Sequence, residues 1–369
     1  MRPKVAVAMS GGVDSSVAAY LLKERGYEVI GLTMQLSSSK ERRSDGPPAC
    51  CGLSDISDAR KVAHHLGIRH YVVNFREVFR KAVINNFIEE YSCGRTPNPC
   101  IRCNKYIKFD FLLRRAREIG ADFLATGHYS RLVPAPDGDK FFLKKGLDNG
   151  KDQSYVLYVL DQEKLKNILL PLGEMTKEEV REIAEREKLP VAHKPESQEI
   201  CFVSGDYRHF LEEEMSFMSQ PGAIVNTQGE VLGRHRGIAS FTIGQRRGIG
   251  LSSGKPLYVL GLNSQKNEVV VGTRDEGYGK EFIVEESNFI SGDKLESEIE
   301  AMVKIRYLHS PALASLIPVK GETLPLQGES LRVIFKEPQW GITPGQSAVF
   351  YHGDIVLGGG IITLTFSLR

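Results

Sequence analysis

The alternation of strand-like and helix-like segments in the first half of the chain constrains its fold more than any other feature. An apolar run over 4–9 precedes helical spacing of apolar residues over 15–25, and Gly26 stands where that helix would stop. Further strands are expected over 27–34, 70–75 and 123–128, and further helices between the second and third strands, over 78–91 and over 108–119. This α/β alternation predicts a parallel sheet with helices on both faces, which binds ligands at the carboxyl ends of its strands.

The pattern changes towards the C-terminus. Thr176 and Glu179 have the spacing of a capping box, which predicts a helix over 176–188 that ends before Pro190. Beyond Pro221, short strands punctuated by glycine are expected over 255–260, 268–271, 331–335 and 355–366. We therefore predict an N-terminal parallel-sheet domain at 1–205, a central β-rich domain at 206–280 and a C-terminal β-barrel domain at 281–369.

Composition excludes several classes of protein. With 41% hydrophobic residues among 369, the chain can bury a large core, which excludes disordered and fibrous proteins. Its 48 basic and 46 acidic residues give a net charge of +2, so any basic surface for a polyanion must be local. The N-terminal residues do not resemble a signal peptide and no apolar stretch is long enough to span a bilayer. We expect a cytoplasmic protein with no membrane partner.

A glycine loop joins the first predicted strand to the first predicted helix, with the sequence Met9-Ser-Gly-Gly-Val-Asp-Ser-Ser16. Such a turn presents backbone amides and a helix N-terminus to an anion. The loop lacks the Gly-Lys-Ser/Thr ending of a Walker A motif, so transfer of a γ-phosphate is not expected. A bare Gly-Gly pair is more often an ordinary turn, in which Asp14 or Ser15 caps the helix.

The whole string Ser10-Gly-Gly-Val-Asp-Ser15 resembles the loop of the ATP pyrophosphatases, which bind ATP, release pyrophosphate and adenylate an oxygen atom. The resemblance implies that ATP and Mg²⁺ are required and that Asp14 helps to place the magnesium ion. It also assigns adenosine contacts to two residues at predicted strand ends. The implied ATP-binding residues are Ala8, Met9, Ser10, Gly11, Gly12, Val13, Asp14, Ser15, Met34 and Gly127.

Three of the six cysteines are candidates for a reactive site. Cys100 and Cys103 form a C-x-x-C pair, and Cys201 follows much later in the chain. Such a pair is as typical of zinc ligation or burial as of catalysis, and zinc would need a fourth ligand. Nearby basic residues would lower the thiol pKa, or else form a solvated face; they are Arg102, Lys105 and Lys108. The other cysteines, Cys50, Cys51 and Cys93, are interpreted as structural.

A set of motifs in fixed order narrows the resemblance to one family. They are the strings at 10–15, 98–109, 125–129, 151–155, 197–202 and 241–248. Together they resemble the tRNA-specific 2-thiouridylases over nearly the whole chain. The resemblance implies an enzyme that adenylates O2 of the wobble uridine in glutamate, glutamine and lysine tRNAs and then replaces that oxygen with sulfur, releasing AMP.

The same resemblance implies two versions of the sulfur chemistry. In the persulfide version, Cys201 carries the incoming sulfur and attacks C2, and Cys103 releases it and ends in a disulfide with Cys201. In this sequence Cys100 replaces the aspartate of the best-known members. A subset of the family with three such cysteines resembles binders of a 4Fe-4S cluster, which would be held by Cys100, Cys103 and Cys201. Both versions remain open.

Partners are implied in part by arginines and in part by the resemblance. Arginine pairs at 234–236 and 246–247, and Arg306-Tyr307 on a predicted strand, suit contacts with phosphates. The resemblance implies tRNA contacts at Asn98, Pro99, Cys100, Lys151, Asp152, Gln153, Arg306 and Tyr307. It also implies a sulfur donor, which would be a cysteine desulfurase, a sulfur-relay protein or inorganic sulfide. We expect a monomer or a weak dimer.

Two other functions compete with thiolation. A different ATP pyrophosphatase, such as an amidating or lysidine-forming enzyme, would need no thiols. A tRNA-binding module that holds zinc through Cys100 and Cys103 would leave the phosphate loop unexplained.

Overall fold

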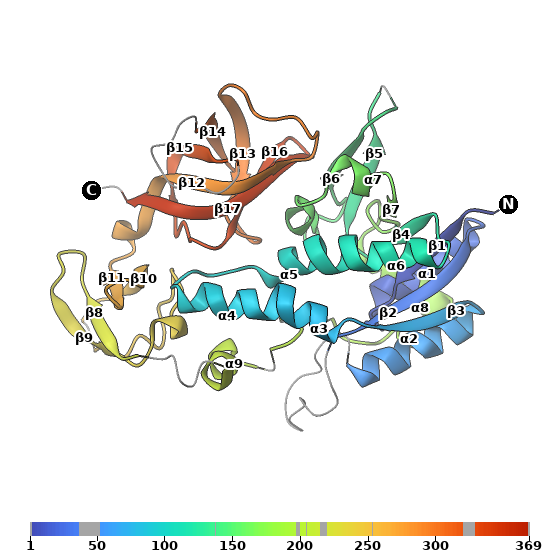
Figure 1. The fold of residues 1–369 in the computed structure, drawn as a ribbon, viewed down its shortest axis with the longest axis horizontal. Coiled ribbons are helices and arrows are strands. Elements are labelled where there is room, and N and C mark those ends of the chain that lie inside the picture. The colour runs from blue at the N-terminus through green and yellow to red at the C-terminus, as the bar shows by residue number, and fades with distance from the viewer. Residues whose placement is uncertain are drawn as a thin grey trace.

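A computed structural model describes residues 2–36, 52–136, 138–196, 200–203, 205–214, 220–252, 254–319 and 329–367. The N- and C-terminal ends lie at opposite ends of the molecule, with the parallel sheet near the N-terminus and two β-rich units towards the C-terminus (Figure 1). This arrangement confirms the predicted fold class.

The N-terminal unit contains a sheet of five parallel strands. Their spatial order is β3 (Arg69–Asn74), β2 (Glu28–Gln35), β1 (Lys4–Ala8), β4 (Phe123–Ala125) and β7 (Ile168–Leu169). Side chains of β1 alternate between two cores, since Val5 and Val7 pack on one side of the sheet and Ala6 packs on the other. Both faces of the sheet are therefore covered.

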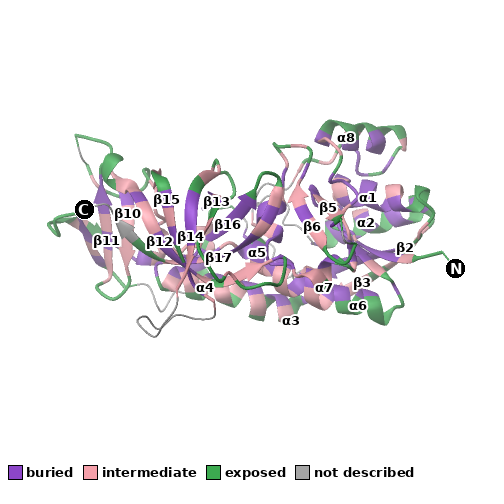
Figure 2. Ribbon diagram, turned by 90° about the horizontal axis from the view of Figure 1, so that it is seen from above, coloured by how far each residue is buried: buried purple, intermediate pink, exposed green. Residues whose placement is uncertain are grey.

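Helices cover the two faces as predicted. On the Val5 side lie α1 (Val13–Glu24), α2 (Leu53–Leu66) and α8 (Lys177–Arg186). On the Ala6 side lie α3 (Arg76–Phe79), η2 (Arg80–Ile84), α5 (Pro99–Arg102), η3 (Cys103–Leu112) and α6 (Leu113–Glu118). The helix α4 (Asn85–Ser92) extends away from the sheet (Figure 1) and buries Phe87 and Tyr91 in a separate cluster with Leu211. The elements η2 and η3 have the wide turns of a π-helix. Figure 2 shows buried residues on the inner side of α8 and exposed residues on its outer side.

The helix predicted over 108–119 begins earlier, at Pro99. The side chain of Asn98 accepts hydrogen bonds from the backbone of Cys100 (3.1 Å) and Ile101 (3.4 Å), and proline is well suited to the first helical position. Cys100 and Cys103 therefore lie on a continuous helical segment and not in a loop.

The C-terminal unit is a closed barrel. Its strands are β12 (Tyr278–Phe289), β15 (Leu331–Trp340), β14 (Ala312–Pro318), β13 (Ile299–Lys304), β16 (Ser347–His352) and β17 (Ile355–Ser367), and β12 also pairs with β17. The central unit follows α9 (Tyr207–Glu214) and contains a sheet in the order β10 (Tyr258–Asn263), β11 (Glu268–Gly272), β8 (Gly222–Val225) and β9 (Val231–His235). Each has its own apolar core.

A hairpin of the N-terminal unit extends the barrel sheet, which the sequence did not predict. Strands β5 (Ser130–Pro134) and β6 (Phe141–Lys145) pair with each other, and Lys144 pairs with Ile355 of β17. The hydroxyl of Tyr155, in η4 (Ser154–Leu157), donates a hydrogen bond to the Ser347 carbonyl at 2.8 Å. The N-terminal unit and the barrel are therefore joined by backbone pairing and by buried side chains.

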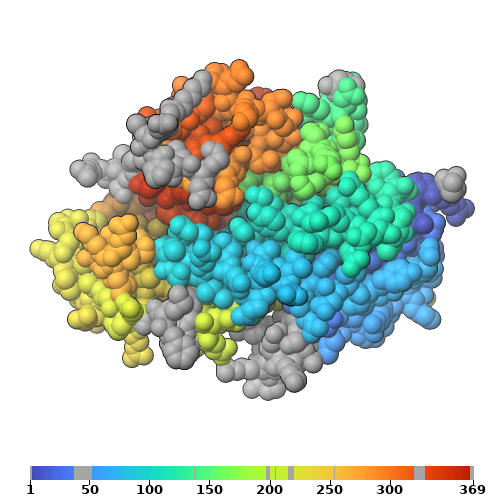
Figure 3. Space-filling view, viewed as in Figure 1, coloured from blue at the N-terminus to red at the C-terminus, as the bar shows by residue number. Residues whose placement is uncertain are grey.

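The barrel also rests on the segment that precedes Cys100. The Thr96 amide donates to the Pro344 carbonyl (2.9 Å), and the Gln346 side chain donates to the Thr96 carbonyl (2.8 Å). In Figure 3 the cyan surface around α4 and α5 lies directly below the orange and red barrel. The remaining short elements are α7 (Gln162–Leu165), η5 (Ile238–Ser240) and η6 (Asp275–Gly277). No helix in the described parts of the chain is long and apolar enough to cross a bilayer.

Candidate active site

The phosphate loop connects the end of β1 to the first turn of α1. Gly11 has a φ of +72°, and a Cβ there would lie 2.3 Å from the Asp55 carbonyl oxygen, so only glycine fits. The Ser15 hydroxyl accepts a hydrogen bond from the Ser10 amide (3.1 Å). No side chain caps the helix at Gly12, which contradicts the ordinary-turn interpretation with Asp14 or Ser15 as a cap. The N-terminal amides of α1 therefore remain available to an anion.

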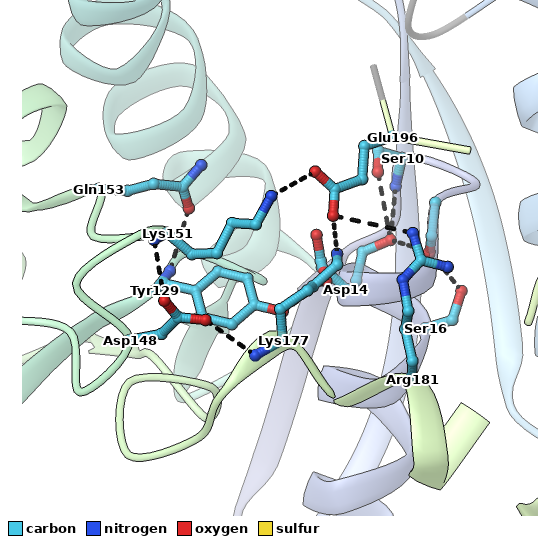
Figure 4. Close-up of polar contacts among 12 residues, drawn as sticks. Ser10, Asp14, Ser16, Tyr129, Asp148, Lys151, Gln153, Lys177, Arg181 and Glu196 are labelled. Atoms are coloured by element: carbon cyan, nitrogen blue, oxygen red, sulfur yellow. Dashed lines mark hydrogen bonds and ion pairs between the residues drawn. The ribbon is translucent and has the colours of Figure 1, made fainter. Parts of the chain in front are cut away.

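Asp14 is engaged by two donors instead. The Tyr129 hydroxyl donates to Oδ1 at 2.8 Å, and Lys177 Nζ lies 2.6 Å from the same oxygen (Figure 4). Burial, and then the charge of Asp14, raise the pKa of Tyr129, so its hydroxyl stays protonated and remains a donor. Oδ2 has no hydrogen-bond partner within the described ranges, so one carboxylate oxygen is left for a hard cation such as Mg²⁺.

The predicted adenosine residues border this loop. Met34 is buried near the end of β2. Gly127 follows β4, and a Cβ there would lie 2.9 Å from the backbone of Asp14 and Ser15. Glycine is therefore required to bring the end of β4 against the phosphate loop. Both residues lie at carboxyl ends of parallel strands, where ligands of such sheets bind.

An ion network covers one side of the loop. Glu196 contacts Lys151 (2.8 Å), Lys177 (3.1 Å) and Arg181 (3.8 Å) (Figure 4). Burial alone would raise the pKa of Glu196, but hydrogen bonds from Lys151 and Lys177 outweigh it and lower that pKa. Glu196 is therefore ionised at neutral pH.

Sequence reasoning missed Lys177, Tyr129 and Glu196. One signal for Lys177 is present in the sequence, because it directly follows the predicted N-cap Thr176, where the helix dipole disfavours a cation. The capping box itself is confirmed by contacts between Thr176 and Glu179. Tyr129 is the last residue of the motif string at 125–129, although no role was assigned to it, and no comparable signal identifies Glu196.

The three candidate cysteines have different environments. Cys100 is exposed on α5, Cys103 is buried at the start of η3, and Cys201 is half-buried against the same apolar core as Cys103. All three are thiols and not disulfides. Burial raises the pKa of Cys103 to about 11, and Lys108 only partly offsets this.

The expectation that three basic neighbours lower the pKa of Cys103 was therefore wrong. Lys105 pairs with Glu286 (3.5 Å) and Arg102 donates to the Ala82 carbonyl (3.0 Å), so both charges are used elsewhere. Lys108 lies 3.4 Å from His128 Nε2, and burial and Lys108 lower the pKa of His128, so the imidazole is neutral. Cys103 is thus a protonated thiol at neutral pH.

The cysteines do not form a metal site in this arrangement. Among the residues that the structure describes, no group of three or more His, Cys, Asp or Glu side chains could hold a metal ion. Cys100, Cys103 and Cys201 are all described, so their thiols do not converge as cluster ligands. The motif residues 197–199, together with Cys50 and Cys51, lie outside the described residues.

Several residues predicted to contact tRNA form hydrogen bonds with the protein's own backbone. The buried carboxylate of Asp152 accepts hydrogen bonds from the amides of Gly146 and Ser154, both at 3.0 Å. Gln153 accepts a hydrogen bond from the Tyr129 amide (3.0 Å). Asn98 caps α5 and Pro99 is buried beside it. These residues fix the shape of the surface around Cys100.

Arg306 and Tyr307 lie in a turn after β13, and the prediction of a strand there was wrong. The strand ends at Lys304, and the His309 amide bonds back to the Arg306 carbonyl (3.0 Å). Burial raises the pKa of Tyr307. The Tyr307 ring lies 6.1 Å from the ring of Tyr155 in η4, and η4 packs against α5, which carries Cys100. A loop of the barrel therefore faces Cys100.

Two further lysines lie near this loop. Lys304 Nζ is 5.8 Å from the ring centres of both Tyr155 and Tyr307, and Lys145 Nζ is 4.9 Å from that of Tyr351. Burial and repulsion by Lys145 lower the pKa of Lys304, although Asp152 opposes this. Neither lysine forms an ion pair with a carboxylate of the described residues, so this surface is locally positive. The arginines of 234–236 and 246–247 lie in the central unit.

Comparison with known proteins identifies the family. Family models match residues 3–205 (tRNA methyl transferase HUP domain), 208–273 (tRNA methyl transferase PRC-barrel domain) and 279–362 (aminomethyltransferase beta-barrel domain). The chain is 52% identical over 363 residues to the tRNA-specific 2-thiouridylase MnmA 2 of Caldanaerobacter subterraneus subsp. tengcongensis, covering 97% of each chain. The chain belongs to the tRNA-specific 2-thiouridylase family.

Other members are almost as similar. Identity is 51% to MnmA 1 of Thermoanaerobacter pseudethanolicus, over 97% of both chains. It is 49% to MnmA of Acetivibrio thermocellus, over 98% of this chain and 99% of that one. Membership of the 2-thiouridylase family confirms the resemblance inferred from the motifs. It favours a sulfurtransferase over the amidating, lysidine-forming and zinc-holding alternatives.

Proposed function

We propose that the protein catalyses ATP-dependent 2-thiolation of the wobble uridine in glutamate, glutamine and lysine tRNAs, producing 2-thiouridine, AMP and pyrophosphate. A chain of charged groups between the phosphate loop and Cys100 carries this proposal. Lys177 joins Asp14 to Glu196, and Glu196 pairs with Lys151. Lys151 lies just before η4, which packs against α5, the helix that carries Cys100. An activated nucleotide and a thiol could therefore meet at one uridine.

In the first step, the phosphate loop binds ATP and the uridine O2 attacks the α-phosphorus, so that pyrophosphate leaves. The residues that hold ATP are Ala8, Met9, Ser10, Gly11, Gly12, Val13, Asp14, Ser15, Met34 and Gly127. Asp14 would hold Mg²⁺ through its unpartnered oxygen, and the ion would supply positive charge to the phosphates. Adenylation converts a poor leaving group on C2 into AMP.

In the second step, sulfur replaces the adenylated oxygen. Cys201 carries a persulfide whose terminal sulfur attacks C2, and AMP leaves. The Cys103 thiolate attacks the inner sulfur of the persulfide, which breaks the sulfur–sulfur bond and forms a disulfide between Cys103 and Cys201. An external thiol must then reduce that disulfide. Because Cys103 is protonated in the ligand-free protein, it must lose its proton before this attack.

The cluster version uses Cys100, Cys103 and Cys201 as ligands of a 4Fe-4S centre. The described residues do not fit such a site, so the persulfide version is the one proposed. Cys100 then borders the target uridine together with Asn98 and Pro99. Further tRNA contacts are proposed at Lys151, Asp152, Gln153, Arg306 and Tyr307.

The remaining proposals concern organisation and partners. The domain boundaries are proposed at 205 and 280; the three matched family regions, 3–205, 208–273 and 279–362, support a division into three parts. The sulfur donor is a cysteine desulfurase, a sulfur-relay protein or inorganic sulfide. The enzyme acts in the cytoplasm as a monomer or weak dimer.

One preparation tests this proposal. Protein purified without oxygen is analysed for iron and acid-labile sulfide, and 2-thiouridine is measured by nucleoside mass spectrometry together with release of pyrophosphate. We expect both products to require tRNA and ATP but no iron. Cys93→Ala should keep both products, whereas Cys201→Ala should lose 2-thiouridine and still release pyrophosphate in the first turnover. About four irons per chain, lost together with thiolation in Cys100→Ala, would replace the persulfide version by the cluster version.

A further inference from the structure

The ion network beside the phosphate loop contains a lysine that no motif assigns. We propose that Lys177 binds the phosphate chain of ATP and that Glu196 occupies Lys177 until ATP arrives, so that the two compete for one ammonium group. This inference rests on the proposed function, because it concerns the nucleotide of that reaction.

Lys177 is a buried cation that lies beside the phosphate loop, where it could bind a phosphate oxygen. Its side chain is only 7% exposed, and Nζ lies 2.6 Å from Asp14 Oδ1 and 3.1 Å from Glu196 Oε1. The ammonium also lies 5.7 Å from the centre of the Tyr129 ring. A phosphate loop of the Walker type contains its own lysine, whereas this loop has none. Lys177 supplies a lysine at the same loop from the first turn of α8.

The charges of the network favour exchange of Glu196. Three cations, Lys151, Lys177 and Arg181, lie among three carboxylates: Asp14 and Glu196 form ion pairs with them, and Asp148 accepts a hydrogen bond from the Lys177 backbone amide. Charges are therefore already balanced in the ligand-free protein, and a triphosphate beside Asp14 would meet like charges. Departure of one carboxylate would leave the network positive.

Glu196 is the carboxylate best able to leave. Asp14 lies within α1, and Asp148 is fixed by hydrogen bonds from the amides of Gly150, Lys151 and Lys177. Glu196 is held by side chains of cations that a phosphate could equally bind. Phosphate oxygens can thus take over its contact with Lys177.

Binding of ATP to the full-length enzyme, measured calorimetrically with Mg²⁺ and without tRNA, tests the proposal. Lys177→Met should weaken binding roughly 10- to 100-fold, as expected for loss of a hydrogen bond to a charged group. Glu196→Gln should instead tighten binding about threefold or more, because the competitor loses its charge. Glu178→Gln is the matched control, since Glu178 is exposed in the same helical turn, and should leave binding unchanged.

The double variant Lys177→Met/Glu196→Gln separates competition from a general change in charge. If Glu196 acts through Lys177, Glu196→Gln should no longer tighten binding once Lys177 is absent. Equal tightening in both backgrounds would overturn the competition, and so would weaker binding in Glu196→Gln alone. Unchanged binding in Lys177→Met would overturn the role of Lys177.

Two controls keep the test independent of folding and of the proposed reaction. Thermal melting of each variant checks the fold, and Lys177→Arg, which keeps the charge, should bind ATP better than Lys177→Met. Release of pyrophosphate in the presence of tRNA by the unmodified enzyme tests the proposed function itself. If the unmodified enzyme binds ATP but releases no pyrophosphate, the proposed function fails while the competition can still be measured.

Discussion

The phosphate loop and the thiol region, which contains Cys100, Cys103 and Cys201, differ in how ready their key groups are to react in the ligand-free protein. At the loop, Asp14 is held by Tyr129 and Lys177 and lies beside uncapped amides of α1. In the thiol region, Cys103 is buried among apolar residues and its pKa is raised to about 11. The loop and Asp14 are therefore already positioned in the ligand-free protein, with only Glu196 to be displaced, whereas the thiol is kept unreactive.

This difference has a chemical rationale. A preorganised charge distribution accelerates adenylation because nothing needs to rearrange as charge develops. A Cys103 thiolate formed before the tRNA binds would be oxidised, or would attack the Cys201 persulfide, form the disulfide and release the outer sulfur as hydrosulfide. Keeping Cys103 protonated avoids both reactions until the substrate is present.

The largest effect is expected from Asp14→Ala. It removes the proposed Mg²⁺ ligand and leaves the buried Lys177 with one partner fewer, so tRNA-dependent release of pyrophosphate should fall by roughly 100- to 1000-fold. Binding of tRNA, measured by filter retention, should stay within about twofold. Asp275→Ala, at an exposed position in the central unit, is the control. Normal release of pyrophosphate by Asp14→Ala would exclude the loop from the reaction.

Gly11→Ala tests how rigidly the loop is built. Gly11 and Gly26 both have positive φ values, but a Cβ at Gly26 meets nothing within 4 Å, whereas one at Gly11 meets the Asp55 carbonyl. Gly26→Ala should lower the free energy of unfolding by about 1 kcal/mol. Gly11→Ala should lower it by roughly a further 1–3 kcal/mol and should also abolish ATP binding. Urea unfolding measures the difference, and equal losses would show that the loop tolerates the added methyl group.

The pKa of Cys103 can be tested by alkylation. Because the thiol is protonated at pH 8, iodoacetamide should modify Cys103 roughly 10- to 100-fold more slowly than the exposed Cys93, and the rate should rise with pH up to about 11. Peptide mass spectrometry identifies the modified residue. Comparable rates for Cys103 and Cys93 at pH 8 would show that Cys103 is not kept unreactive, and the proposed difference between the thiol region and the phosphate loop would be wrong.

The same pKa predicts a loss of stability at high pH. The folded-state pKa of Cys103 lies above its ordinary value of 9.0, so the unfolded chain loses this proton first. Its contribution to stability is complete below about pH 9 and declines between about pH 9 and pH 11. Cys103→Ala should remove that part of the decline in urea unfolding, whereas Cys93→Ala should not.

Local chemistry explains which elements could be predicted from sequence. The capping box of Thr176 and Glu179 and the strand, Gly-Gly turn and helix at the N-terminus depend on neighbouring residues only. The early start of the helix at Pro99 was also encoded locally, by the Asn98 cap, but was not recognised.

Long-range packing explains what could not be predicted. The pairing of Lys144 with Ile355 joins residues far apart in sequence, and no local pattern marks it. The basic neighbours of Cys103 were visible in the sequence, but their direction and the burial of the thiol were not. Lys177 reaches Asp14 only because α8 packs against α1.

The smallest effect, and the one that relates the thiol region to RNA, is expected from Lys304→Met. Lys304 forms no ion pair with a carboxylate of the described residues and lies 5.8 Å from the ring centres of Tyr155 and Tyr307. Burial lowers the pKa of Lys304, Asp152 opposes this, and repulsion by Lys145 adds to it. If this surface takes a tRNA phosphate, the variant should weaken tRNA binding a few-fold and reduce the slope of log affinity against log salt by about 0.7–0.9.

The control for that measurement is Lys61→Met, which removes an exposed lysine of α2. It should change neither the affinity nor the slope. If Lys304→Met changes neither the tRNA affinity nor the slope, the positive surface beside Cys100 does not bind tRNA phosphates. A reduced slope would mean instead that the RNA brings its negative charge to the region where Cys103 must lose a proton. Because a nearby phosphate would oppose formation of a thiolate, activation of Cys103 would then have to come from Lys108 and from release of the buried thiol.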